Sequence, residues 1–184
     1  MDSPDTQRYV ERIAAPLVER AREARSGVSY RFAALDGLAH VNAFAESGGF
    51  LYVYSRLIVA AEDEAELASV LAHEIGHIVG RHSANQLASQ LGLQLISAIA
   101  QGEGASEYAV YIANVTAKLG RVRFSRDDER QADRYGLRYV LESGGKTSVE
   151  DLFSSHPATE ERKLDLEARI GHSSVEDGSA QRIA

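Results

Sequence analysis

The residues with the clearest capacity for chemistry are His73, Glu74 and His77, in the stretch His73-Glu74-Ile75-Gly76-His77. On a helix, residues four apart lie one turn apart on the same face, so both imidazoles can bind one metal ion. Glu74 can then reach a water molecule on that ion. Zinc lowers the pKa of its water toward about 7, and a carboxylate can remove the proton as the water attacks a carbonyl. The pattern alone leaves open two ordinary surface histidines, because a catalytic zinc needs a third protein ligand.

Two residues compete to be that third ligand, His82 and Glu129. An extended form of the motif would place a third histidine three residues after Gly80, but Ser83 occupies that position and His82 misses it by one. That class also needs a downstream methionine, and the only methionine in the chain is Met1. We therefore expect His82 to be a solvated residue near a helix end, where it interacts favourably with the helix dipole.

Glu129 is the better candidate, and it lies in the acidic segment Ser125–Asp133. Asp133 follows Glu129 by one helical turn, so the two carboxylates share a face. A ligand glutamate with a second carboxylate that receives the free N–H of a ligand histidine is a common arrangement around zinc. Asp127 and Asp128 are expected to form a solvated face.

Small residues accompany these candidates on both helices. Gly76 and Gly80 share the face of the two histidines, whereas Ala132 and Gly136 share the face of Glu129 and Asp133. A glycine inside a helix costs about 1 kcal/mol relative to alanine. Small residues on both faces allow two helices to approach closely enough to share one ion.

The elements that must position these residues define an α+β chain that is mainly helical. Alternating apolar residues predict strands at about 28–34, 40–44 and 50–55, with turns at Asp36-Gly37 and Gly48-Gly49. We expect a small antiparallel three-stranded meander beside the helix that carries the histidines. Apolar stripes and capping residues predict helices over 6–25 (with a kink or restart at Pro16), about 62–80, a segment containing Leu87 to Ile99, 108–119, a helix from Ser125 to about 143, and 159–170.

Length and composition indicate one domain over residues 1–184, with an N-terminal helical segment at 1–27 and a flexible tail at 171–184. The net charge of −7 and the lack of a basic stripe argue against a nucleic-acid partner. With no cysteine, only histidine and carboxylate remain as strong metal ligands. The most apolar stretch, Leu91–Ala100, is too short for a membrane span, and the first residues are not a signal peptide.

Four segments together resemble the gluzincin metallopeptidases that include the CAAX prenyl endopeptidase, the HtpX heat-shock peptidase and related soluble bacterial peptidases. The resemblance covers about residues 38–170. Its segments are VNAFA at 41–45, LAHEIGHIVGRHS at 71–83, FSRDDERQADRYG at 124–136 and SSHPATEER at 154–162.

The resemblance implies a zincin-like domain that holds one zinc ion per chain. By position it implies that His73, His77 and Glu129 are the metal ligands, that Glu74 is the general base and that Asp133 supports a ligand histidine. It also implies that His156 and Arg162 line the cleft. Asn42, Ala43 and Phe44 would form an edge segment that holds the substrate backbone. The membrane spans of the integral members are missing, which points to the soluble branch. That branch implies a periplasmic protein with envelope or membrane-protein partners; a cytoplasmic location is the alternative.

These observations predict a zinc-dependent endopeptidase that acts on unfolded or misassembled polypeptides. The rival class is a zinc-containing chaperone or assembly factor with little or self-inhibited proteolysis, and a purely structural site would use four ligands and no base. His156 precedes Pro157, which disfavours a helical conformation there, so we expect His156 on an extended loop. It would act either as a fourth, inhibitory ligand or as a donor to the oxyanion.

Overall fold

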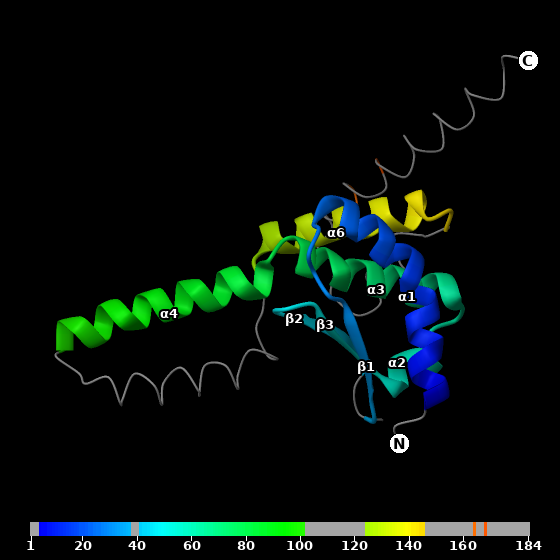
Figure 1. Ribbon diagram of the computed structural model, residues 1–184, viewed down its shortest axis with the longest axis horizontal. Coiled ribbons are helices and arrows are strands. Elements are labelled where there is room, and N and C mark those ends of the chain that lie inside the picture. The colour runs from blue at the N-terminus through cyan, green and yellow to red at the C-terminus, as the bar shows by residue number, and fades with distance from the viewer. Residues whose placement is uncertain (1–3, 38–40, 102–123, 146–163, 165–167, 169–184) are drawn as a thin grey trace, which may run out of the picture.

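The computed structural model describes residues 4–37, 41–101, 124–145, 164 and 168. It is a mainly helical α+β structure, as predicted, in which α1 and α3 pack against a small sheet and α6 packs against α3 (Figure 1). The elements are α1 (Pro4–Ala24), β1 (Arg31–Leu35), β2 (Ala43–Glu46), β3 (Phe50–Tyr54), α2 (Ser55–Ala60), α3 (Glu64–Val79), α4 (His82–Gln101) and α6 (Arg126–Glu142).

The sheet is mixed, so the predicted antiparallel meander is wrong. Its order is β1-β3-β2, with β1 parallel and β2 antiparallel to β3. Asp36-Gly37 therefore forms no hairpin, and the chain crosses the end of β3 before β2 begins. The physical reason is burial: β3 carries Leu51 and Val53, both 0% exposed, and the central position gives this strand a partner on each edge.

The turn between β2 and β3 forms as predicted at Gly48-Gly49. Both glycines have positive φ values, 93° and 92°, which side-chain-bearing residues rarely adopt. A Cβ on Gly49 would also lie 2.5 Å from the Ser29 carbonyl oxygen. The hairpin thus places β2 at the edge of the sheet, beside α3.

Helix α1 buries the stripe that the sequence predicts and packs it on α3. It continues through Pro16 to Ala24, so the helix does not restart there. Proline removes the hydrogen bond to the carbonyl four residues earlier, at Arg12. Because Pro16 and Arg12 are both exposed, water can satisfy that carbonyl. The buried positions of the stripe are Val10, Ile13, Ala14, Leu17, Val18 and Ala21.

Local signals define where α3 and α6 begin. The Asp63 side chain caps α3 by accepting hydrogen bonds from the backbone N–H groups of Ala65 and Glu66. Ser125 and Asp128 form the predicted capping box at the start of α6. These caps fix where each helix begins, and the buried residues along each helix define the face that packs against its neighbour.

The two helices cross at their small residues. A Cβ on Gly76 would lie 2.7 Å from the Ala132 carbonyl oxygen, and a Cβ on Gly136 would lie 3.0 Å from the His73 backbone nitrogen. The first distance is shorter than real Cβ contacts and the second is shorter than most of them, so the predicted close approach of the two helices is confirmed.

Helix α4 forms as predicted and extends away from the sheet and from α3 (Figure 1). The predicted helices at 108–119 and 159–170, the start of the second predicted strand at His40 and the tail at 171–184 lie outside the described residues, apart from Leu164 and Ala168. In the part of the chain that the structure describes, no helix combines the length and apolar character needed to cross a membrane.

Candidate metal centre

His73 and His77 lie one turn apart on α3 and are almost fully buried, with relative exposures of 0% and 1%. Their Nε2 atoms are 3.1 Å apart and point to the same place. Two buried imidazoles with converging nitrogens are a costly arrangement unless something satisfies both of them. Their geometry is that of a pair of ligands rather than of two surface histidines.

Glu129, on α6, brings a carboxylate to this pair. Its Oε2 lies 3.6 Å from His73 Nε2, and its Oε1 lies 3.9 Å from His77 Nε2. One ligand atom from each of the three residues lies within 4.8 Å of the others. Two imidazoles and one carboxylate form a donor set that catalytic zinc sites use, whereas calcium and magnesium prefer oxygen ligands alone. The residues therefore fit zinc.

Asp133 lies one turn beyond Glu129 and reaches the other side of His73. Its Oδ1 is 3.0 Å from His73 Nδ1, and its side chain is 2% exposed. Burial lowers the pKa of His73, but hydrogen bonding to Asp133 and Glu129 and the nearby charge of Glu74 raise it to about 9. The Asp133 carboxylate therefore lies against Nδ1 of the His73 ring, on the side away from the Nε2 atom that faces the cluster.

Glu74 is only 1% exposed and lies next to His73 on α3. A carboxylate buried this deeply needs a polar function or partner, because its transfer from water is costly. Its charge acts on His73, whose pKa it raises, so the Glu74 carboxylate lies close to the cluster.

The prediction for His82 is wrong. It is 2% exposed and begins α4 rather than ending a helix in solvent. Its Nδ1 lies 2.8 Å from His77 Nδ1, and its Nε2 lies 2.8 Å from Gln131 Oε1. Arg81, whose φ is 59°, lies in the turn between α3 and α4, and the His82 ring that follows this turn contacts His77 on α3.

Two other residues around the centre were also missed. Phe124 stacks on the His77 ring, with the ring centroids 4.0 Å apart and the planes at 23°. Gln131 reaches His82 from α6. Gly80, directly before Arg81-His82, was the one available signal, since a Cβ there would overlap the His82 ring. The small size of Gly80 leaves room for the His82 side chain, whereas the small size of Gly76 leaves room for the backbone of α6.

The edge segment that was predicted to hold substrate lies on β2. Because the Tyr54 N–H donates to the Asn42 carbonyl, alternation directs the backbone groups of Ala43 and Ala45 to the open side of the sheet. Ser83 Oγ already donates to the Ala45 carbonyl, at 3.2 Å. Phe44 stacks on Tyr52 across the strands, with centroids 4.9 Å apart. Ala43 is the residue of this segment whose main chain faces away from β3, and it is fully covered, at 0% exposure.

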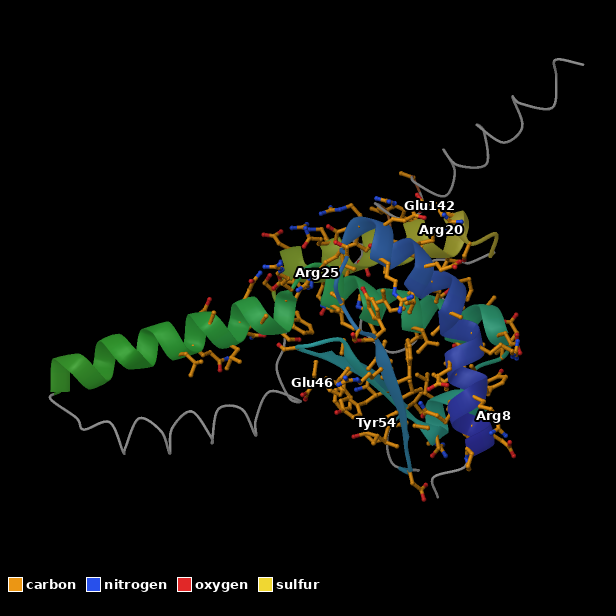
Figure 2. All side chains as sticks on the ribbon, in the orientation of Figure 1. Arg8, Arg20, Arg25, Glu46, Tyr54 and Glu142 are labelled. Carbon is orange, nitrogen blue, oxygen red and sulfur yellow. The ribbon has the colours of Figure 1, made fainter. Side chains whose placement is uncertain are left out.

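A cavity of about 270 Å³ adjoins the centre on the side of the β2–β3 turn. His77 and Arg81 line it together with Arg25 and Glu46, which are labelled in Figure 2. Arg25 donates to the Ile78 carbonyl at 2.5 Å and so holds the C-terminal end of α3. His156 and Arg162 lie outside the described residues, so the structure does not place them.

Together the fold and the cluster define a class: a helical α+β domain with a histidine pair on one helix and a carboxylate from a second. Residues 4–170 match peptidase family M48, and the chain belongs to that family. Peptidases of this family depend on a metal, and the cluster of His73, His77 and Glu129 could hold one in this chain.

Relatives with assigned names are β-barrel assembly-enhancing proteases. The chain is 30% identical over 152 residues to the protein of Yersinia pestis and 27% identical over 155 residues to that of Escherichia coli strain K12, covering 77% and 78% of this chain. This chain is also 30% identical, over 171 residues or 88% of its own length, to a protein of Vibrio cholerae serotype O1 that bears the same name provisionally. The matched region spans only 30–35% of these relatives.

The metal-free protein is expected to lose stability as the pH rises through about 9. The folded-state pKa of His73 is about 9, above the ordinary 6.5, so its protonation stabilises the fold fully below pH 6.5 and the effect disappears above pH 9. The loss should be roughly 3 kcal/mol. Urea unfolding of chelator-treated protein across this range measures it, with His73→Gln as the control that should lack it. A decline of equal size in His73→Gln would contradict the assignment.

Proposed function

We propose that the chain is a zinc-dependent endopeptidase that hydrolyses peptide bonds of unfolded or misassembled proteins. The observation that carries the proposal is the convergence of His73, His77 and Glu129, with buried Glu74 beside them. His73 and His77 would hold the metal through Nε2, and Glu129 through its carboxylate. When bound, zinc supplies Lewis acidity that makes a water molecule reactive at neutral pH.

The protein's own residues would carry the proton transfers. The Glu74 carboxylate takes the proton from the attacking water and gives it to the departing amine nitrogen. Asp133 holds the His73 ring in place through Nδ1 throughout. His156 and Arg162 are proposed for the cleft by family resemblance, with His156 as either a fourth, inhibitory ligand or a donor to the oxyanion.

The edge strand supports an extended substrate. A peptide that adds to β2 would pair its main chain with Ala43 and the Ala45 N–H, and it would lie beside α3, where the candidate ligands are. Because Ala43 and Ala45 are 0% and 7% exposed, the peptide would have to displace the groups that cover them. Asn42 and Phe44 flank these groups while their own backbones face β3. Strand addition recognises main chain and requires the substrate segment to be unfolded. It also leaves both ends of the peptide free, which suits an endopeptidase.

The names of the relatives support an envelope setting. We propose that this chain, like proteins named for β-barrel assembly, works in the periplasm on membrane-protein substrates or partners, with one zinc ion per chain. The matched region spans about a third of these relatives, so the proposal for this chain concerns the peptidase region that it shares with them. The alternative, a chaperone or assembly factor with little proteolysis, is less favoured because it has no use for a buried Glu74.

Glu129→Ala is expected to lower zinc affinity by at least 100-fold and to abolish zinc-dependent degradation of an unfolded protein, because removing one of three ligands leaves the ion incompletely held. Metal content and chelator competition measure binding, and degradation of reduced casein measures activity. Glu142→Gln, at the far end of the same helix, is the matched control and should behave as wild type. Unchanged zinc binding in Glu129→Ala would refute the ligand assignment, and wild-type protein without zinc-dependent cleavage would refute the proposed function.

A further inference from the structure

His82 contacts a ligand candidate on the side that faces away from the metal position. Its Nδ1 lies 2.8 Å from His77 Nδ1, and the two rings meet edge to face at 79°. The other ring nitrogen, Nε2, lies 2.8 Å from Gln131 Oε1, with the Asp128 carboxylate 3.7 Å away. Every polar atom of the buried His82 ring therefore faces a specific group.

The chemistry of imidazole allows only one proton arrangement along this chain when His77 binds a metal. A neutral ring carries one N–H, so binding through Nε2 requires the proton of His77 on Nδ1. That N–H must donate to His82 Nδ1, which places the His82 proton on Nε2. The His82 Nε2–H then donates to Gln131 Oε1, an atom that can only accept. In this arrangement each of the two hydrogen bonds has one donor and one acceptor.

The fold creates room for this chain of contacts at a specific position. Gly80 ends α3, and a Cβ there would overlap the His82 ring and lie 2.9 Å from Gln131 Oε1. The φ of Gly80 is −68°, so the backbone does not require glycine at this position. Space for the contact between His82 and Gln131 does require it. Gln131 comes from α6, the helix that also supplies Glu129.

We propose that His82 is a positioning residue that holds His77 in the tautomer and orientation in which Nε2 is presented to the metal. His82 would accept the Nδ1–H of His77 as Asp133 would accept that of His73. The acceptor for His77 is a neutral imidazole backed by a glutamine amide, whereas the acceptor for His73 is a carboxylate. Each ligand histidine is then oriented through its Nδ1. The inference rests on the proposed metal site.

Two substitutions at His82 separate positioning from simple packing. His82→Asn keeps an acceptor where Nδ1 faced His77, whereas His82→Gln places its amide near the Nε2 position and loses that acceptor. Both are smaller than the imidazole ring, so both should destabilise the metal-free protein to a similar extent. We expect His82→Gln to lower zinc affinity about 10–100-fold, and His82→Asn to stay within about threefold of wild type.

The readouts are zinc affinity by chelator competition, unfolding of the chelated protein, and nitrogen NMR of the His77 ring. In zinc-loaded wild type and in His82→Asn, the ring should show a protonated Nδ1 in slow exchange with water; in His82→Gln that proton should exchange fast. Equal zinc affinities in the two variants, whether both lowered or both unchanged, would overturn the positioning role. A failure of the proposed function looks different, since wild type would then bind no zinc.

Gly80→Ala tests the same contacts without altering either histidine. The added methyl displaces the His82 ring, so zinc affinity should fall at least tenfold although alanine favours the helix. Gly92→Ala is the control, because a Cβ there meets nothing within 4 Å. Zinc affinity of Gly80→Ala equal to that of Gly92→Ala would count against His82 as a positioning residue.

Discussion

Glu74→Gln is expected to reduce proteolysis by about 10²–10⁴-fold while bound zinc stays near one per chain. Glutamine has nearly the same shape as glutamate, so the buried position, 1% exposed, can hold it without a cavity. It cannot take a proton from water at neutral pH. Because Glu74 is proposed as base and not as ligand, the loss should be confined to turnover.

The experiment compares casein degradation and metal content in wild type, Glu74→Gln and Glu66→Gln. Glu66 lies on the same helix, in its first turn, and Glu66→Gln makes the same change of charge away from the cluster. We expect Glu66→Gln to match wild type in both measurements. Loss of zinc from Glu74→Gln would make Glu74 a ligand and overturn the mechanism. Retention of proteolysis in that variant would remove it from the chemistry altogether.

Gly76→Ala is expected to destabilise the protein and weaken zinc binding at the same time. The new Cβ would lie 2.7 Å from the Ala132 carbonyl oxygen and 3.0 Å from its Cα, both backbone atoms that cannot rotate away. Helix α6 must therefore shift, and overpacking of this kind costs about 1–3 kcal/mol. Since α6 carries Glu129, the same shift moves a ligand candidate away from His73 and His77. Zinc affinity should fall by at least tenfold.

Urea unfolding of the chelated protein and chelator competition for zinc measure the two effects separately. Gly92→Ala is again the control, since alanine should stabilise α4 by about 1 kcal/mol at a position with open space. A variant Gly76→Ala with the stability and zinc affinity of wild type would show that the two helices do not depend on this contact. In that case the interpretation of the small residues as a requirement of the site would be wrong.

Much of the candidate site could be predicted from the sequence, because its ligands come from local patterns. The spacing of His73 and His77 defines their shared face once the segment is a helix, and Asp63 marks where that helix begins. The capping box of Ser125 and Asp128 likewise marks where α6 begins, and Glu129 and Asp133 share one face of that helix. Gly76 and Gly136, unfavourable within a helix, indicated that the two helices approach each other, and the structure confirms it.

The strand order and the environment of His82 were decided by tertiary structure alone. The turn signal at Asp36-Gly37 is local and says nothing about strand order. The centre of a sheet is occupied by the strand that buries more apolar surface. Here that strand is β3, which buries Leu51 and Val53. His82 follows a helix end, where a histidine is usually solvated. The ring is enclosed because the turn at Arg81 leaves it against His77 and because α6 brings Gln131, 49 positions later in the chain, to its other side. The pattern of one segment contains no information about a contact that three segments form together. The candidate ligands could therefore be predicted from the sequence, whereas the contact between His82 and His77 could not.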